Sequence, residues 1–127
     1  MASQTWILVL NWNEAEQTIA CLESIRNSST ACIAGVVLCD NASCDGSIER
    51  VHDWARSASW VVTEWRLGSA GSFQLEPRGV TASMAPEGRA MELVLIHTGA
   101  NRGFAGGIYV GLRWLLAIEP FRLVFLL

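Results

Sequence analysis

The stretch GVVLCDNASCDGS, residues 35–47, decides the fold. Its first five residues form a continuous apolar run, which is typical of a strand buried on both faces of a sheet. The cluster from Asp40 to Ser47 that follows is rich in residues that favour turns and helix caps. The stretch therefore predicts a buried strand that ends in a polar loop, followed by a helix from Ser47 to about Arg56.

The same order of strand, polar loop and helix occurs upstream of this stretch. An apolar run at 6–10 ends in the polar residues 11–13. Beyond them, the apolar residues Ile19, Leu22 and Ile25 recur at three-residue spacing, as on an amphipathic helix. This half of the chain predicts a strand, a loop and a helix over residues 14–27.

Downstream, three further apolar runs predict strands at 60–65, 91–97 and 123–127. The second of these is followed by a glycine loop at 99–107 and a helix through Ala117. Residues 66–89 contain glycine, serine and proline with weak periodicity, so we expect an irregular insertion there. A loop is predicted for this insertion, with a hairpin as the alternative.

Strands that alternate with helices predict an α/β fold of Rossmann-like type. Helical crossovers between the strands imply a mostly parallel sheet with helices on both faces. The 127 residues, 51% of them hydrophobic, are enough for a core but for one domain at most. Ligands of such sheets bind beyond the carboxyl ends of the strands. The polar loops after the strands are therefore the expected place for a site.

Charge and composition argue against several classes of function. The net charge is −3, and the nine basic residues, all arginine, are scattered, so no nucleic-acid partner is expected. The four cysteines lack metal-site or CxxC spacing, which favours reduced thiols. The start lacks a signal peptide, and residues 108–127 are interrupted by charges and a proline. A soluble cytoplasmic protein is predicted, with peripheral contact to the inner membrane as the alternative.

The loops after the first two strands carry candidate nucleotide ligands. In the loop 11–14, the indole of Trp12 offers a surface for a planar base. The alternative is that Asn13 caps the helix, with Glu14 favoured by the helix dipole. At the next strand end, Asp40 is suited to accept a hydrogen bond from a base N–H or a ribose hydroxyl. Asp45 is expected to serve the helix start.

The third loop, NRGFAGG at 101–107, opens a helix with three glycines. Glycines let backbone amides approach a diphosphate at the positive end of a helix, and Arg102 adds charge. Close packing of the helix on a strand is the alternative role of these glycines, because their spacing is not the dinucleotide fingerprint. His97 is predicted to be structural, since the sequence shows no carboxylate or serine partner for it.

Together, three segments resemble family 2 glycosyltransferases, especially the rhamnosyltransferase-like branch. They are ILVLNWN at 7–13, DNASCDGS at 40–47 and NRGFAGG at 101–107, and their order and spacing match over nearly the whole chain except 66–89. The resemblance implies a GT-A fold, of which residues 1–127 are a single partial domain, truncated at the C-terminus. It also implies a UDP-, dTDP- or GDP-linked sugar donor, an inverting transfer and a saccharide acceptor, as in surface polysaccharide synthesis.

By the family pattern, the loop from Leu10 to Glu14 and Asp40 hold the base and ribose, and the glycine segment borders the ribose and diphosphate. Magnesium or manganese and a catalytic carboxylate belong to the family, but both are expected beyond Leu127. The chain departs from the pattern at Ile108 and Tyr109, where members usually carry two asparagines. The predicted nucleotide-binding residues are Leu10, Asn11, Trp12, Asn13, Glu14, Asp40, Asn41, Ser43, Asp45, Asn101, Arg102, Gly103 and Gly106.

Because the metal motif is missing, we expect this chain alone to bind nucleotide weakly and to catalyse little or nothing. One alternative is a non-catalytic module that self-associates through the exposed apolar strand 123–127. A Rossmann-type oxidoreductase or methyltransferase is less consistent with the sequence, because its glycine loop would follow the first strand.

Overall fold

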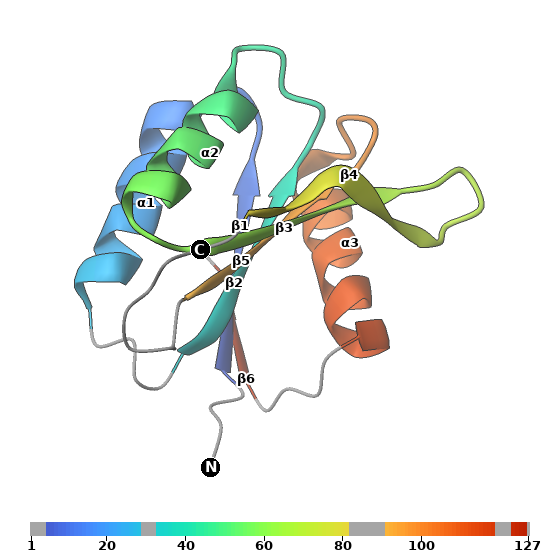
Figure 1. Ribbon diagram of the computed structural model, residues 1–127. Helices are drawn as coiled ribbons and strands as arrows, with labels where there is room; N and C mark the ends of the chain where they lie inside the picture. The colour runs from blue at the N-terminus through green and yellow to red at the C-terminus, as the bar shows by residue number, and fades with distance from the viewer. Residues whose placement is uncertain (1–4, 29–32, 82–90, 119–122, 127) are drawn as a thin grey trace.

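The computed structural model describes residues 5–28, 33–81, 91–118 and 123–126. Strands and helices alternate along most of the chain, as Figure 1 shows. The elements are β1 (Thr5–Asn11), α1 (Ala15–Asn27), β2 (Ile33–Asp40), α2 (Ser47–Ser57), β3 (Val61–Leu67), β4 (Phe73–Thr81), β5 (Glu92–His97), α3 (Gly103–Ile118) and β6 (Leu123–Leu126).

The strands form one sheet in the order β4-β3-β5-β2-β1-β6. Strand β1 pairs in parallel with β2 and β6, and β5 pairs in parallel with β2 and β3. Among the described strands, β4 alone runs antiparallel to its neighbour β3. The predicted α/β fold with a mostly parallel sheet is confirmed. The strand order reverses at β1, because the chain leaves it toward β2 and returns on its other side as β6.

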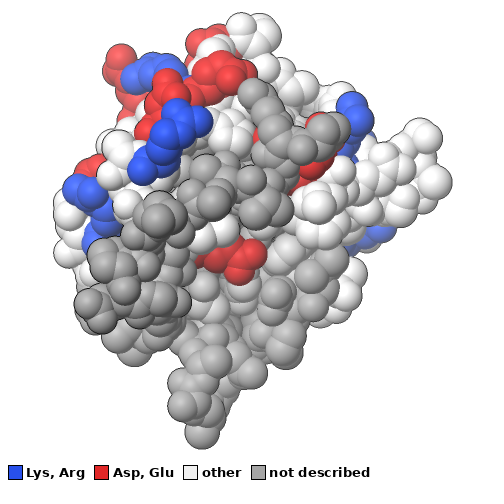
Figure 2. All heavy atoms as spheres, in the orientation of Figure 1, with Lys and Arg blue, Asp and Glu red and all other residues white. Residues whose placement is uncertain are grey.

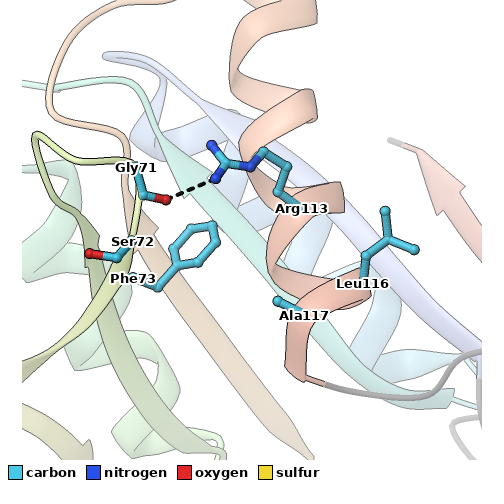
Figure 3. A pocket seen from close by; sticks show the side chains of 6 residues that line it. All are labelled: Gly71, Ser72, Phe73, Arg113, Leu116 and Ala117. Carbon is cyan, nitrogen blue, oxygen red and sulfur yellow. Dashed lines mark hydrogen bonds between the residues drawn. The ribbon is translucent and has the colours of Figure 1, made fainter.

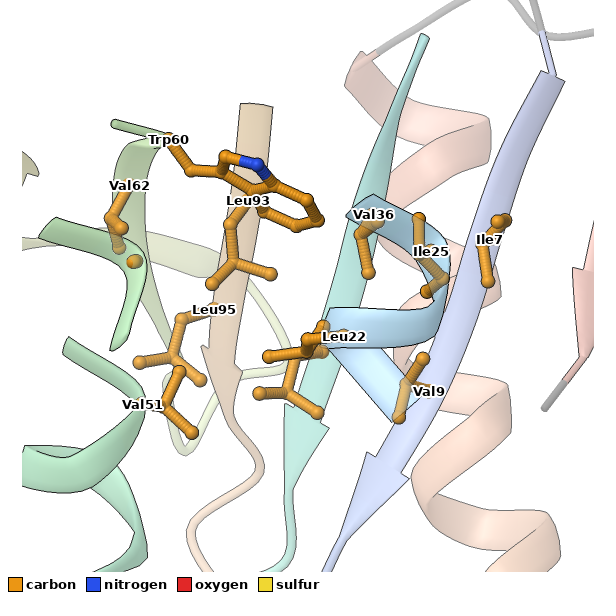
Figure 4. Packing of buried hydrophobic residues seen from close by; sticks show 12 residues of the cluster. Ile7, Val9, Leu22, Ile25, Val36, Val51, Trp60, Val62, Leu93 and Leu95 are labelled. Carbon is orange, nitrogen blue, oxygen red and sulfur yellow. The ribbon is translucent and has the colours of Figure 1, made fainter. Parts of the chain in front are cut away.

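Helices cover both faces of the sheet, as predicted. Helices α1 and α2 lie on one face and α3 lies on the other (Figure 1). Alternate strand residues divide between the two faces, because side chains of a strand point alternately to opposite sides. On the first face, Leu22 and Ile25 of α1 and Val51 of α2 pack on the sheet (Figure 4). The strand residues of this cluster are Ile7, Val9, Val36, Leu38, Val62, Leu93 and Leu95.

On the opposite face, α3 packs very close to the sheet. A Cβ atom at Gly111 would lie 2.5 Å from Leu8 Cδ1 and 2.8 Å from Cys39 Sγ, so only glycine allows this approach. Further along the helix, Trp114 is buried and makes edge contacts with Trp6 and Trp65. Close packing of helix on strand is therefore one role of the glycines in α3.

The predicted loop over 66–89 is wrong in its first part, where the hairpin alternative is correct. Residues 73–81 form β4, which pairs with β3. The turn between them is closed by hydrogen bonds from Gly71 N–H to the Gly68 carbonyl (2.9 Å) and from Gly68 N–H to the Ser72 carbonyl (2.8 Å). Gly71 has a φ of 82°, which glycine adopts without strain. Residues 82–89 of the insertion lie outside the described residues.

Candidate functional site

A network of polar side chains joins the ends of β1 and β2. The parallel register places Asn11 beside Asp40. The Asn11 amide donates to Asp40 Oδ1 at 2.8 Å and to Ser43 Oγ at 3.0 Å. Ser43 in turn donates through its hydroxyl to Asp40 Oδ1 (2.7 Å) and through its N–H to Asp40 Oδ2 (2.9 Å). From α1, Thr18 Oγ1 donates to Asn11 Oδ1 at 2.6 Å. We call these four residues the rim network.

Asp40 is the centre of the rim network, and it is only 2% exposed. Its two oxygens accept three hydrogen bonds from within the chain. An ionised carboxylate has about four acceptor positions, so one position, on Oδ2, is left without a partner among the described residues. In the folded chain, Asp40 therefore holds the loop after β2 against the end of β1.

Asn13 fastens the same two loops together. Its N–H donates to Ser43 Oγ at 2.9 Å, and its Oδ1 accepts from the Cys44 N–H at 2.8 Å. Helix α1 begins after Glu14, which makes no side-chain capping hydrogen bond. The alternative that Asn13 caps α1 is thus wrong, because its carboxamide is used between the loops. The neighbouring Trp12 is 49% exposed, which leaves its indole facing solvent.

Asn41 connects the loop after β2 to the start of α3. Its Nδ2 donates to the Gly103 carbonyl at 3.0 Å, and its Oδ1 accepts from Thr98 Oγ1 at 2.9 Å. Asn101 Oδ1 accepts from the Gly103 N–H at 3.0 Å. Arg102 Nε donates to the Thr98 carbonyl at 3.0 Å. The loops that follow β1, β2 and β5 consequently form one continuous rim at the carboxyl end of the sheet.

The first turn of α3 presents exposed backbone at this rim. Residues 101–105 are exposed, and Gly103 has a φ of 72° that favours glycine. The first amides of a helix lack acceptors within the helix and carry its positive end. Gly107 instead faces Leu10 and Asn41, because a Cβ there would lie 2.3 Å from Leu10 Cδ1 and 3.0 Å from Asn41 Oδ1.

The other predicted site residues occupy less central places. Leu10 packs with the core on the α3 face, and Glu14 is exposed at the start of α1. Gly106 lies against Arg102 in the first turn of α3. Asp45 serves the start of α2, as predicted, because it accepts hydrogen bonds from the Ser47 hydroxyl and N–H. These two hydrogen bonds lower the pKa of Asp45, and the bond from the Ser47 hydroxyl has the larger effect.

A second buried carboxylate, Glu64 of β3, belongs to a cluster that the sequence does not predict. It is 2% exposed. Its Oε1 lies 2.9 Å from His52 Nε2 of α2, and its Oε2 is hydrogen-bonded to His97 Nε2 of β5. Burial would raise the pKa of Glu64, but the hydrogen bonds and charges of His52 and His97 lower it to about 2. The prediction that His97 has no carboxylate partner is wrong.

The signal that could have found this cluster is strand alternation. Glu64 lies two residues after the buried Val62, and His97 lies two residues after the buried Leu95. Alternate residues of a strand share a face, so both polar side chains point toward the face that α1 and α2 cover. A glutamate at such a position needs a buried partner.

A pocket of about 320 Å³ opens beside the histidine cluster. Arg66 of β3 and Glu76 of β4 form an ion pair in its wall, with Arg66 Nε 2.9 Å from Glu76 Oε1. Ala42, from the loop that Asp40 holds, supplies another part of the wall and has a φ of 62°, which is strained for alanine. The pocket therefore adjoins the rim network. Its lining residues are Ala42, Glu64, Arg66, Glu76, His97 and Gly99.

A second hollow, of about 530 Å³, lies between the β3–β4 turn and α3 (Figure 3). Arg113 crosses it, with Nη2 donating to the Gly71 carbonyl at 2.8 Å and the guanidinium 5.8 Å from the ring centres of Phe73 and Tyr109. The rest of its lining is Ser72, Leu116 and Ala117. The described residues that line this hollow include one charged side chain, that of Arg113, beside aromatic and aliphatic groups.

The described residues also bear on the expectations about charge, metal ions, thiols and membrane helices. On the face that Figure 2 shows, arginines and acidic residues are interspersed near α1 and α2. Within the described ranges, no three or more His, Cys, Asp or Glu side chains are arranged to hold a metal ion. The three described cysteines, Cys21, Cys39 and Cys44, are free thiols, and burial raises the pKa of Cys39 to about 12. None of the helices among the described residues is long and apolar enough to cross a membrane.

Comparisons of the chain with protein-family models, with curated proteins and with solved structures find no match.

Proposed function

We propose that the continuous rim after β1, β2 and β5 binds a nucleoside diphosphate, as the donor-binding part of a GT-A, family 2-like glycosyltransferase. One observation carries the proposal: hydrogen bonds join the three segments on which the sequence resemblance rests. Asn11 Nδ2 lies 2.8 Å from Asp40 Oδ1, and Asn41 Nδ2 lies 3.0 Å from the Gly103 carbonyl. Residues that are 29 and 62 positions apart in the sequence therefore meet at one end of the sheet, where ligands of such folds bind.

The start of α3 has the chemistry that a diphosphate needs. The Gly103 N–H is bonded to Asn101, and the amides of the exposed residues 104 and 105 that follow it carry partial positive charge at the end of a 16-residue helix. Gly103 adds no side chain that would cover them. The Nε atom of Arg102 donates to the Thr98 carbonyl, which orients the guanidinium. Its two terminal amino groups have no partner among the described residues. In this proposal, those groups and the amides bind the two phosphates.

The loops after β1 and β2 suit the nucleoside. The exposed indole of Trp12 offers a face on which a base stacks, since stacking on aromatic side chains is a common way to hold a base. The remaining acceptor position on Asp40 Oδ2 suits a base N–H or a ribose hydroxyl. Asn11, Asn13 and Ser43 then position these groups, because each of them is hydrogen-bonded to another residue of the two loops.

The proposal also includes a saccharide acceptor and a magnesium or manganese ion. When bound, such an ion would neutralise charge on the departing diphosphate. No cluster among the described residues fits it. The described residues therefore bind and orient the donor in this proposal, and no step is assigned to a metal.

Binding measurements test the proposal directly. We would titrate the purified chain with UDP, dTDP, GDP and ADP and with their nucleosides, with and without manganese, by calorimetry and amide NMR. We expect saturable binding of at least one diphosphate, tighter than its nucleoside, with shifts at residues 12–13, 41–43 and 101–105. Failure of every nucleoside diphosphate to bind saturably would overturn the proposal.

A matched pair of variants separates the rim from general charge. Arg102→Ala should weaken diphosphate binding by about tenfold, the equivalent of one charge-assisted contact, and leave nucleoside binding unchanged. Arg56→Ala is the control, because Arg56 is an exposed arginine on α2, away from the rim. Equal effects of both variants would argue against Arg102 as a phosphate ligand.

A second candidate function is self-association, which the place of β6 favours. Strand β6 lies at one edge of the sheet, with β1 as its partner among the described strands, and edge strands expose unpaired backbone. Tyr109 (61%) and Leu116 (75%) of α3 are also exposed. Light scattering of the purified chain over a range of concentrations should then give a dimer or a larger species. A monomer at every concentration would exclude this candidate.

A further inference from the structure

Within the described residues, the histidine cluster leaves the Nδ1 atom of His97 without a partner, and His97 lines the pocket. Glu64 accepts hydrogen bonds only, because an ionised carboxylate has no proton to donate. His97 Nε2, bonded to Glu64 Oε2, must therefore carry the ring proton. In the neutral ring, His97 Nδ1 is then a proton acceptor. It has no hydrogen-bond partner in the part of the chain that the structure describes.

Glu64 is held from two sides, so it fixes the orientation of His97. The carboxylate is 2% exposed, and His52, which is 11% exposed, occupies its second oxygen at 2.9 Å. His97 is 25% exposed, so its ring reaches from the buried carboxylate to the pocket. A carboxylate that holds one ring nitrogen sets the tautomer of the ring and fixes its orientation.

The pocket beside His97 has the size and lining for a small polar ligand. Its 320 Å³ lies at the lower end of the range for ligand pockets, roughly 300 to 1,000 Å³. Arg66 supplies hydrogen-bond donors and Glu76 supplies hydrogen-bond acceptors. The small residues Ala42 and Gly99 leave room for the ligand. Such a lining matches a molecule with several hydroxyl groups, each of which both donates and accepts.

Charged or titratable side chains lie around His97 on four elements. They are Glu64 and Arg66 of β3, Glu76 of β4, His52 of α2 and Asp40 of β2, which is paired with His97 in the parallel register. The Arg66–Glu76 ion pair balances its own charge. The Glu64 carboxylate is then the charge that an imidazolium at His97 would meet first.

We propose that this pocket binds a polyhydroxylated molecule of the monosaccharide class, and that His97 Nδ1 accepts the proton of one of its hydroxyl groups. Glu64 acts as a positioning residue that stabilises the resulting imidazolium. The O–H bond breaks, the proton moves to Nδ1 and the electron pair stays on the oxygen. The identity of the ligand as a sugar acceptor rests on the proposed function, because the activated oxygen would attack the anomeric carbon of a donor bound at the adjacent rim. The bond from that carbon to the diphosphate oxygen would break, and the nucleoside diphosphate would leave with the electron pair.

Side-chain NMR of the whole chain tests the inference without any need for turnover. Long-range ¹H–¹⁵N spectra report the tautomer of each histidine, and His97 is expected to carry its proton on Nε2. Titration with a panel of monosaccharides should shift the His97 Nδ1 signal saturably. A proton on Nδ1, or an Nδ1 signal that no monosaccharide moves, would overturn the inference.

A matched set of ion-pair variants locates the ligand. The double variant Arg66→Ala with Glu76→Gln removes polar groups of the pocket and should weaken saccharide binding by at least about fivefold. Arg56→Ala with Asp53→Asn removes an exposed ion pair on α2 and should leave binding unchanged. Equal binding by both double variants would contradict a site in this pocket.

The role of Glu64 has its own readout. Glu64→Gln keeps the shape but can donate as well as accept, so His97 should lose its single tautomer and saccharide binding should weaken. An unchanged tautomer would show that Glu64 does not position the ring. If this variant does not fold, the tautomer of the wild-type chain still decides the inference.

Titration of the same samples with the nucleoside diphosphates separates the two proposals. Nucleotide binding without saccharide binding would overturn the inference and leave the proposed function intact. Saccharide binding without nucleotide binding would overturn the proposed function and leave a saccharide site at His97.

Discussion

Asp40 and Glu64 are two buried carboxylates on the strands that flank β5, and their surroundings differ in kind. Each is 2% exposed. Asp40 is bonded to Asn11 and Ser43, whose amide and hydroxyl groups do not titrate. Glu64 is bonded to two histidines, His52 and His97, whose imidazole nitrogens can each donate or accept a proton. The first arrangement suits a scaffold, and the second suits proton transfer.

The two arrangements also differ in the polar groups that they leave for a ligand. The rim network satisfies its own donors and leaves one acceptor position on Asp40. The histidine cluster satisfies its carboxylate but leaves a ring nitrogen at a pocket. A network whose donors are all paired fixes the shape of a rim, whereas a ring nitrogen at a pocket offers a hydrogen bond to a ligand. Four substitutions test this contrast.

Asp40→Ala should have the largest effect, a loss of about 3 kcal/mol in the free energy of unfolding. It removes the acceptor of the Asn11 amide and of two Ser43 groups, and buried donors without acceptors are costly. Denaturant unfolding measures the change. Asp53→Ala, at an exposed ion pair, is the control and should cost no more than about 0.5 kcal/mol. A similar small cost for Asp40 would mean that it does not hold the rim.

Glu64→Gln should change how stability depends on acid. The pKa of Glu64 is lowered from 4.5 to about 2, so its contribution is present above pH 4.5 and is lost as the pH falls through about 2. The variant should be less stable at neutral pH by about 2 kcal/mol and should lack this dependence. Denaturant unfolding at a series of pH values checks both. Parallel pH curves for the two proteins would refute the charge-based view of the cluster.

Gly107→Ala should lower stability by about 1 kcal/mol. Its Cβ would lie 2.3 Å from Leu10 Cδ1 and 3.0 Å from Asn41 Oδ1, and this crowding outweighs the better helix propensity of alanine. The side-chain amide signal of Asn41 should shift in the NMR spectrum. Leu116→Ala, at an exposed position of the same helix, should change neither quantity.

Thr18→Val should have the smallest effect, about 1 kcal/mol or less. It removes the donor to Asn11 Oδ1 at 2.6 Å and keeps the shape of the side chain. Thr63→Val is the matched control, because the buried Thr63 hydroxyl has no hydrogen-bond partner among the described residues. Thermal unfolding should show a loss for Thr18 and no loss, or a gain, for Thr63. The reverse order would mean that the rim network adds nothing to stability.

The two carboxylates also mark what the sequence can and cannot predict. Asp40 could be predicted as a site residue from the sequence, because it directly follows a buried strand and shares one loop with Ser43. Glu64 lies 12 residues from His52 and 33 from His97. Their meeting depends on β5 lying between β2 and β3, and hydrophobic periodicity predicts strands but not their lateral order.

The same limit explains the error at β4. Its residues include a proline and a glycine, which locally favour a loop, and pairing with β3 supplies the backbone hydrogen bonds that override this preference. The bounds of α1 and α2 were predictable to within a residue or two, whereas α3 begins at Gly103, inside the predicted glycine loop 99–107. Contacts between loops, such as Asn41 with Gly103, have no such periodic pattern.

The parallel register places Asp40, His97 and Arg66 side by side across β2, β5 and β3. Neighbouring strands of a sheet lie about 4.8 Å apart, and the backbone ladder keeps that spacing nearly constant. The sheet therefore fixes the distance between the rim and the imidazole of His97. Loop sequences on either side can vary while this distance stays the same, so ligand preference and reactive geometry are separately adjustable in this fold.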